Sequence, residues 1–315
     1  MDYLKGRVIR STGSWYEVYI SNNQSTISCR MPGKFRLDGF KLTNPVAVGD
    51  YVQIVMEEDN KGMIKKIEDR KNYIIRQSPR KKHHIHIIAS NVDQAILVTT
   101  IANPKLKQGF IDRFLMMTEP FDIPVLIVFN KIDIYTEKDH ALCEEMIKLY
   151  TDIGYHCLSV SATTGEGIDD FNQNLFHKTS LITGQSGVGK TTLLNQLSDQ
   201  LNLRTNYLSD YTGKGMHTTT FAELFDIGED RVIIDTPGIK TLSFNHLEPM
   251  DVVHNFKEIF EYAEHCKYNN CTHREEPHCA VKEAVIANEI SELRYYNYLQ
   301  ILDEIEDQNH WERLR

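Results

Sequence analysis

Residues 184–192 read Gly184-Gln185-Ser186-Gly187-Val188-Gly189-Lys190-Thr191-Thr192, and they give the clearest indication of the fold class. It fits the pattern G-x-x-x-x-G-K-[ST], which is typical of a loop that binds phosphate groups. The glycines let backbone N–H groups turn toward a phosphate, Lys190 can neutralise phosphate oxygens, and the Thr191 hydroxyl can ligate Mg²⁺. An apolar segment precedes the loop and a helical pattern follows it. We therefore expect all nine residues to bind a nucleotide, with Lys190 also acting in catalysis.

A second motif, Asn130-Lys131-Ile132-Asp133, follows the apolar segment Val125–Phe129. The Asp133 carboxylate could accept hydrogen bonds from the ring N–H and the amine of guanine, whereas adenine offers no such pair of donors. A buried acceptor without a partner is costly, so this residue favours guanine. Ser161-Ala162 would be the next base contact. Taken alone, the tetrapeptide is also an ordinary sequence for the start of a helix. However, ligands bind at the carboxyl ends of parallel strands, and these motifs all follow expected strands. Their shared position therefore favours a binding site.

A third set of residues is expected to contact the γ-phosphate. Asp235-Thr236-Pro237-Gly238 closes the apolar segment 231–234, so that Asp235 can hold Mg²⁺ through water and the Gly238 N–H can meet the phosphate. In the polar loop 211–220, we expect Thr219 to complete the Mg²⁺ shell. His217 is the candidate for orienting the attacking water; the alternative is a histidine that contacts RNA or only solvent. Ile239 stands where Ras-like proteins have a glutamine, so intrinsic turnover should be slow.

The order of these motifs differs from that in Ras-like GTPases. There the phosphate loop, switch threonine and Asp-x-x-Gly precede Asn-Lys-x-Asp and Ser-Ala, whereas here the last two come first. The termini of a domain commonly lie close together, so a link near residues 168–179 could join the old ends. The sequence therefore predicts a circularly permuted GTPase domain.

Four residues near the C-terminus have the spacing of metal ligands: Cys266, Cys271, His273 and Cys279. Three thiolates and one imidazole suit tetrahedral Zn²⁺ and leave no open position, so the ion would be structural. The alternative is a set of reduced cysteines beside a surface histidine. We expect Cys29, Cys143 and Cys157 to be packing residues.

The chain divides into three regions. Short alternating segments predict an N-terminal all-β barrel over residues 1–75, and a polar run with a proline predicts a linker over residues 76–88. Apolar strands alternating with helices predict a mainly parallel α/β sheet over residues 89–245. Residues 246–315 are expected to form a mainly helical zinc-binding domain.

Charge is distributed unevenly along the chain. Residues 1–90 carry 16 Lys and Arg against 9 Asp and Glu, whereas the rest carries 19 against 35. A polyanion should therefore meet the N-terminal region first, although such a face can also be merely solvated. The linker cations Arg80, Lys81 and Lys82 and the aromatic residues Trp15, Tyr16 and Phe35 favour RNA, unless the aromatics belong to the core.

The composition also limits the cellular compartments in which the protein is expected. No apolar run reaches the about 18 residues that span a membrane, and residues 1–10 lack the apolar centre of a signal peptide. We expect a cytoplasmic protein with no membrane partner and reduced cysteines. A monomer is also expected.

The combination resembles the ribosome small-subunit-dependent GTPase A (RsgA) family, also known as YjeQ or YloQ, over nearly the whole chain. The motifs that carry the likeness are Ala89-Ser90-Asn91-Val92-Asp93-Gln94, residues 130–133, 184–194, 215–219 and 235–238, and the four zinc ligands. The resemblance implies an OB-fold barrel, binding to the small ribosomal subunit and its rRNA late in maturation, and GTP hydrolysis stimulated by that subunit. Two features depart from the family: Thr191-Thr192 replaces a commoner Ser-Ser, and the C-terminus is acidic where many relatives have a basic tail.

Two other functions would use part of the same set of motifs. A GTP-binding RNA scaffold with negligible turnover would use the same motifs, and only turnover in the presence of its particle would distinguish the two. A P-loop kinase that uses ATP is disfavoured by Asp133 and by the lack of a recognisable acceptor site.

Overall fold

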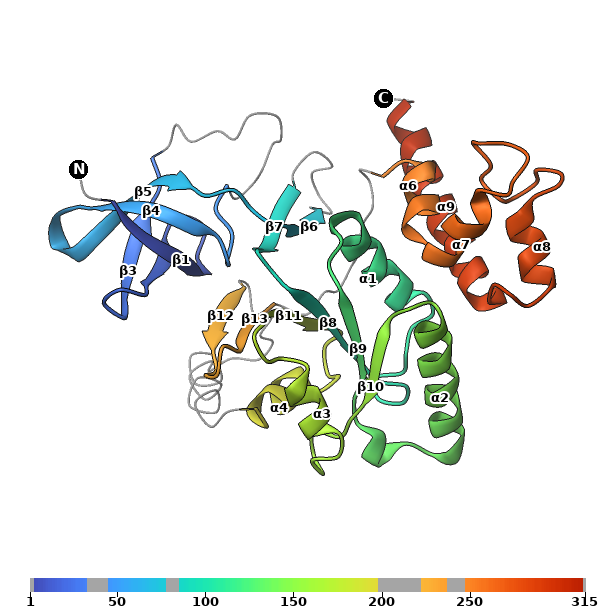
Figure 1. The fold of residues 1–315 in the computed structure, drawn as a ribbon, viewed down its shortest axis with the longest axis horizontal. Coiled ribbons are helices and arrows are strands. Elements are labelled where there is room, and N and C mark those ends of the chain that lie inside the picture. Colours follow the sequence, from blue (N-terminus) through green and yellow to red (C-terminus); the bar gives the residue numbers. More distant parts are fainter. Residues whose placement is uncertain (1–2, 33–44, 78–84, 198–221, 237–246, 314–315) are drawn as a thin grey trace.

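The computed structural model describes residues 3–32, 45–77, 85–197, 222–236 and 247–313. Three regions follow one another in it: a β-barrel, a central sheet flanked by helices, and a C-terminal helical region (Figure 1). These are the regions that the sequence predicts.

In the described residues, the N-terminal barrel has five strands: β1 (Leu4–Ser11), β2 (Tyr16–Ile20), β3 (Ser25–Arg30), β4 (Tyr51–Met56) and β5 (Lys61–Ile67), with the short helix η1 (Glu58–Asn60) before β5. The strands are ordered β1-β2-β3-β5-β4, and β4 returns to pair with β1, which closes an OB-like barrel. Alternate residues point inward, so Val8, Val18 and Ile64 form part of its core. Tyr16 belongs to this core too, so for this aromatic residue the second of the two alternatives, a place in the core, is the correct one.

The expected linker is wrong at both of its ends. Strand β6 (Tyr73–Gln77) pairs antiparallel with β7 (Ile85–Ser90), so the polar run lies between two paired strands. Ile74, Ile87 and Ala89 are buried, and this apolar spacing is what anchors the ribbon. Arg80, Lys81 and Lys82 lie outside the described residues, as does Phe35.

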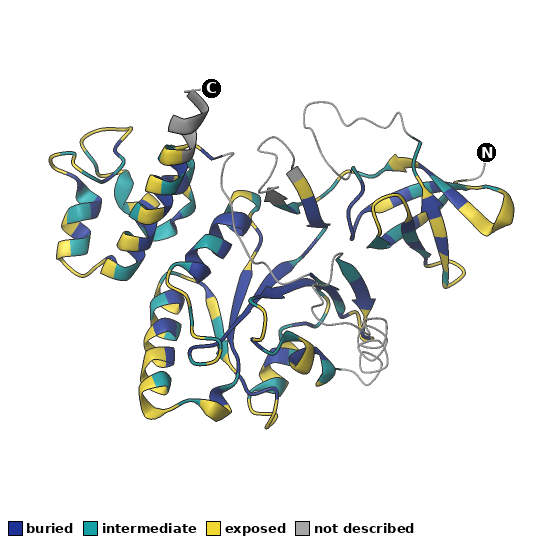
Figure 2. Ribbon diagram, turned by 180° about the vertical axis from the view of Figure 1, so that it is seen from behind, coloured by how far each residue is buried: buried dark blue, intermediate teal, exposed yellow. Residues whose placement is uncertain are grey.

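The described part of the central sheet contains six strands: β8 (Gln94–Thr99), β9 (Val125–Phe129), β10 (His156–Ser159), β11 (Thr179–Gly184), β12 (Glu223–Asp226) and β13 (Val232–Asp235). Their order is β10-β9-β8-β11-β13-β12, and neighbours are parallel except for β12 and β13. Every residue of β8, β9 and β11 is buried (Figure 2), as expected for strands covered on both faces.

Four helices of the described chain cover this sheet: α1 (Phe110–Thr118), α2 (Glu137–Asp152), α3 (Ile168–Gln173) and α4 (Lys190–Asn195). Helices α1 and α2 lie on one face, and α3 and α4 on the other (Figure 1). Successive residues of β8 face opposite sides, so Leu97 packs in the core with Phe114 and Ile96 in the core with Phe171. Two short helices, η2 (Glu119–Phe121) and η3 (Ile132–Ile134), occupy connections.

The C-terminal region consists of α6 (Pro249–Asn255), α7 (Lys257–Ala263), α8 (Ala280–Ile286) and α9 (Glu292–Arg313). Its apolar core is continuous with the core beneath α1 and α2. At the junction, the Arg294 guanidinium contacts the Asp112 carboxylate at 2.6 Å and the Glu258 carboxylate at 2.6 Å. The C-terminal helices are thus fixed to the central domain by a buried ion pair and by apolar packing.

The barrel is also attached to the central domain. Strand β1 pairs with the edge strand β12 at Arg10 and Glu223, so that one sheet runs through both regions. Arg7 donates to the Thr179 hydroxyl at 3.0 Å, and the Thr179 N–H donates to the Asp93 carboxylate at 2.8 Å. Since Thr179 begins β11, the barrel contacts the strand that leads into the phosphate loop.

Candidate nucleotide site and metal centre

The phosphate loop connects the end of β11 to the start of α4. A Cβ on Gly184 would lie 2.1 Å from the Val98 carbonyl oxygen, so only glycine fits there. Gly187 and Gly189 have φ values of 84° and 92°, in the left-handed region that glycine adopts without strain. The backbone therefore turns tightly around the space in front of α4. Val188 is buried, whereas Ser186, Thr191 and Thr192 are exposed and Gln185 is partly exposed.

Lys190 folds over this loop. Its ammonium group donates to the carbonyl oxygens of Gly184 at 2.8 Å and Gln185 at 2.9 Å. Burial lowers the pKa of Lys190, an effect that nearby Asp235 opposes. The cation thus lies inside the loop, at the position where phosphate oxygens would need neutralising.

Asp235 lies at the same edge of the sheet. Its strand β13 runs parallel to β11 with Ile182 opposite Asp235, and Thr236 donates through its N–H to the Ile182 carbonyl at 3.3 Å. Burial raises the pKa of Asp235 to about 6, although Lys190 pulls it down. A carboxylate here and a hydroxyl on Thr191 are the hard oxygen ligands that suit Mg²⁺.

Asn130 joins the motifs that the sequence separates. Its side-chain NH₂ donates to the Val188 carbonyl at 2.9 Å, and its side-chain oxygen accepts from the Ala162 N–H at 3.0 Å. The side chain is only 1% exposed, so both bonds are shielded from water. The loop of residues 130–133, the phosphate loop and the Ser161-Ala162 turn are therefore brought together around one amide.

The rest of the tetrapeptide is oriented around the same point. The Lys131 ammonium donates to the carbonyls of Gly187 at 2.6 Å and Asn103 at 2.9 Å. The Ser161 hydroxyl donates to the Asp133 carboxylate at 2.6 Å, and Asp133 remains exposed. Asp133 can therefore accept further hydrogen bonds from a base.

Sequence reasoning missed Tyr135, whose hydroxyl contacts the backbone of Asn130; no motif marks this position. It also missed Asn103, which accepts from Lys131. The expected γ-phosphate and water-positioning residues Gly238, Thr219 and His217 lie outside the described residues.

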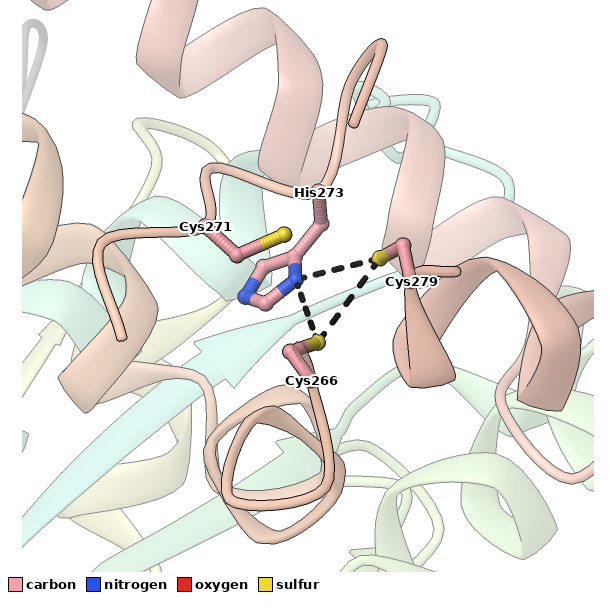
Figure 3. Close-up of side chains that lie close together, drawn as sticks. All are labelled: Cys266, Cys271, His273 and Cys279. Atoms are coloured by element: carbon pink, nitrogen blue, oxygen red, sulfur yellow. Dashed lines mark hydrogen bonds between the residues drawn. The ribbon is translucent and has the colours of Figure 1, made fainter. Parts of the chain in front are cut away.

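The four cysteine and histidine side chains of the C-terminal region point toward one another (Figure 3). Their ligand atoms all lie within 4.8 Å of one another. The Cys266 and Cys279 sulfurs are 3.9 Å apart, and His273 Nδ1 lies 3.5 Å from the first and 3.3 Å from the second. Tetrahedral Zn²⁺ requires about 3.8 Å between sulfurs and about 3.6 Å between sulfur and nitrogen. The donor set and its spacing therefore fit one metal ion with four protein ligands.

The loop that carries these ligands is held by neighbouring side chains. Glu276 accepts from the N–H groups of Thr272 and Arg274 at 2.7 and 2.8 Å. Burial alone would raise the pKa of Glu276, but these bonds outweigh it and lower the pKa to about 2. From α9, the Tyr295 hydroxyl donates to the His273 carbonyl at 2.5 Å and the Tyr298 hydroxyl to the Thr272 carbonyl at 2.9 Å. The metal loop (residues 266–279) is thus tied to α9, the helix that carries Arg294.

Over the described part of the chain, no helix combines the length and the apolar character needed to cross a membrane.

Comparison with known proteins gives matches along the chain. The family described as RsgA GTPase matches residues 67–245, and the RsgA N-terminal domain matches residues 5–64. A small ribosomal subunit biogenesis GTPase RsgA from Phocaeicola vulgatus is 49% identical over 304 residues, covering 96% of this chain and 98% of the relative. The protein of the same name from Flavobacterium johnsoniae is 45% identical over 305 residues, which cover 95% of this chain and 93% of the relative.

Two solved structures are similar over nearly the whole chain. YjeQ from Thermotoga maritima superposes with a TM-score of 0.76 at 33% identity, covering 96% of this chain and 99% of that one. YloQ, described as a circularly permuted GTPase, gives a TM-score of 0.73 at 29% identity, covering 98% and 96%.

Proposed function

The chain belongs to the RsgA family of GTPases, and from this premise we propose that it hydrolyses GTP to GDP and phosphate during late maturation of the small ribosomal subunit. The observation that carries the proposal is the position of Asn130, whose amide joins the guanine-reading loop, the phosphate loop and the Ser161-Ala162 turn. Relatives that are named small ribosomal subunit biogenesis GTPases support the choice of particle.

In this proposal each part of the site has a separate task. Asp133 accepts from guanine while Ser161 holds its carboxylate, and Ala162 supports the base from the next strand end. Residues 184–192 surround the phosphates with N–H groups, and Lys190 neutralises charge that develops on the phosphate oxygens. Gly238 contacts the γ-phosphate, and His217 orients the water.

Two metal ions complete the proposal. Thr191, Thr219 and Asp235 would hold Mg²⁺, which would supply positive charge to neutralise the phosphate oxygens. Zn²⁺ would be held by Cys266, Cys271, His273 and Cys279 as a structural ion, because four protein ligands leave no position for a substrate.

The barrel is the proposed contact for rRNA. Trp15 is 39% exposed with the Lys61 ammonium 5.9 Å from its ring centroid, and Tyr51 is 48% exposed with Arg7 at 5.2 Å. Aromatic faces beside cations suit nucleotides, since bases stack and phosphates are attracted. With such a partner we place the protein in the cytoplasm, as a monomer. A GTP-binding scaffold with negligible turnover is not favoured, since the relatives are named GTPases.

The proposal is tested by sedimentation with purified ribosomal subunits. We expect the protein to pellet with small subunits more in a non-hydrolysable GTP analogue than in GDP, and not with large subunits. Asn130→Ala should remove the dependence on nucleotide, while Asn174→Ala, a partly exposed amide on the same domain, should not. Equal pelleting with both nucleotides and both subunits would contradict the proposed function.

A further inference from the structure

Tyr135 lies two residues beyond the guanine-reading tetrapeptide and carries a half-buried ring. Its hydroxyl accepts a hydrogen bond from the Ile101 N–H at 2.8 Å and lies 3.0 Å from the Asn130 carbonyl oxygen and 3.3 Å from the Thr100 hydroxyl. A phenol has one proton to donate. Because a carbonyl can only accept, that proton goes to Asn130, and the Thr100 hydroxyl can donate to the phenol oxygen.

The hydroxyl therefore connects two strand ends. Thr100 and Ile101 directly follow β8, and Asn130 directly follows β9. One further bond joins these ends, from the Asn130 N–H to the Thr99 carbonyl at 2.8 Å. With both bonds made, the backbone of Asn130 is held on its N–H side and on its carbonyl side.

The peptide held in this way is the one from which the base-reading residues extend. Lys131 follows immediately with φ of 68°, a left-handed conformation that side chains other than glycine adopt at a cost. Asp133 lies in the short helix η3, which starts at the next residue. A shift of the Asn130 carbonyl would change the direction in which η3 begins, and with it the position of the Asp133 carboxylate.

We propose that Tyr135 is a positioning residue for guanine recognition, because its hydroxyl fixes the Asn130–Lys131 peptide and so aims Asp133 at the base. Burial raises the pKa of Tyr135, so the phenol keeps the proton that it donates. The ring itself is placed independently by an edge-on contact with His140, whose centroid lies 5.5 Å away. The ring can therefore stay in place when the hydroxyl is removed.

This inference rests on the proposed role of Asp133, and inosine diphosphate tests both separately. Inosine lacks the exocyclic amine of guanine, so it loses one of the two bonds to Asp133. A hydrogen bond to a charged acceptor changes affinity by roughly tenfold or more, so the native protein should prefer GDP to inosine diphosphate by about that factor. A native protein without this preference would overturn the proposed function itself.

The deciding experiment measures dissociation constants of both diphosphates for Tyr135→Phe. We expect GDP to bind about tenfold more weakly and the preference for GDP over inosine diphosphate to fall at least about threefold. Tyr150→Phe is the matched control, since it also removes a buried hydroxyl, one that donates to Asp112 at 2.6 Å away from the base-reading loop. Tyr150→Phe should prefer GDP to inosine diphosphate by the same factor as the native protein, even if the variant is less stable.

The inference is overturned if folded Tyr135→Phe keeps the native preference for GDP over inosine diphosphate. It is also overturned if the variant binds both diphosphates more weakly by the same factor, because that result indicates a structural role only. Should Tyr135→Phe fail to fold, Tyr135→Met supplies a second variant without the hydroxyl, since methionine adapts to irregular apolar space. The preference for GDP over inosine diphosphate is then measured in Tyr135→Met, and the same two results would overturn the inference.

Discussion

At the scale of single residues, the nucleotide site depends on buried amide and hydroxyl groups that join loops from different strands. Asn130 illustrates this best, since its two side-chain bonds reach Val188 and Ala162, and neither partner is near it in the sequence. The glycine at position 189 permits the contact, because a Cβ there would lie 2.5 Å from the Asn130 side-chain nitrogen.

Asn130→Ala should therefore weaken GDP binding by at least about tenfold. Each lost bond is worth roughly 1 kcal/mol, and the Val188 carbonyl and Ala162 N–H are left without these partners. Isothermal titration with GDP measures the effect. Asn174→Ala, which removes an exposed bond to Asp170, should bind GDP like the native protein, and a similar loss in both variants would contradict the prediction.

A second prediction at this scale concerns Gly49, whose φ is 95° and whose added Cβ would lie 2.1 Å from the Ser90 carbonyl oxygen. Gly49→Ala should lower the free energy of unfolding by about 3 kcal/mol or more, because backbone strain and a clash add. Gly13→Ala has a similar φ of 90° with nothing nearby, so it should cost only about 1 kcal/mol. Urea unfolding compares the two, and equal losses would show that the contact with Ser90 is not tight.

At the scale of elements, the metal loop is a unit closed by its ligands and by α9. Chelation should free the thiols of Cys266, Cys271 and Cys279, whereas Cys29, Cys143 and Cys157 should stay unreactive. Burial raises the pKa of Cys29 and Cys143 to about 12 and of Cys157 to about 11, so at pH 8 these thiols remain protonated. Burial also raises the pKa of Cys271 in the folded loop, so we expect the ligand thiols to react fast only once loss of the metal opens that loop.

A thiol reagent at pH 8 counts the groups. We expect few fast thiols before a zinc chelator is added and three afterwards, and Cys143→Ala should leave that number unchanged. Release of no thiols would argue against a bound metal, and release of all six would mean that the whole chain unfolds.

The secondary-structure elements differ in how well the sequence alone predicts them. The buried strands β8, β9 and β11 and the phosphate loop were predictable because their residues carry the signal locally: continuous apolar runs for the strands, and glycines beside Lys190 for the loop. The β6–β7 ribbon was not, because the polar run that follows β6 is equally typical of a linker, and only the partner strand distinguishes the two. The contact of Tyr135 with Asn130 was hidden for a related reason, since a tyrosine after a turn has many possible partners.

At the scale of the whole molecule, the barrel and the helical region are both attached to the GTPase domain by contacts between distant residues. Arg294 and Asp112 are 182 positions apart and both buried, so no local pattern indicates their pairing. The guanidinium also lies 4.3 Å from the centroid of the Phe256 ring. The C-terminal helical region should therefore move with the GTPase domain as one body.

Arg294→Met should lower the free energy of unfolding by about 3–5 kcal/mol, because Asp112 and Glu258 keep buried charges without their cation. Arg113→Met, which breaks a partly exposed pair with Glu304, should cost at most about 1 kcal/mol. Calorimetry measures both. A loss of similar size in the two variants would show that the junction is not an electrostatic anchor.

The central claim is that this chain is a GTPase switched by the small ribosomal subunit, and turnover tests it most directly. GTP hydrolysis is measured for the purified protein alone, with small subunits and with large subunits, using Lys190→Ala as the inactive control. We expect slow turnover by the protein alone, a large increase with small subunits only, and no turnover in Lys190→Ala. Turnover that is the same with and without small subunits would contradict it and leave a nucleotide-binding scaffold.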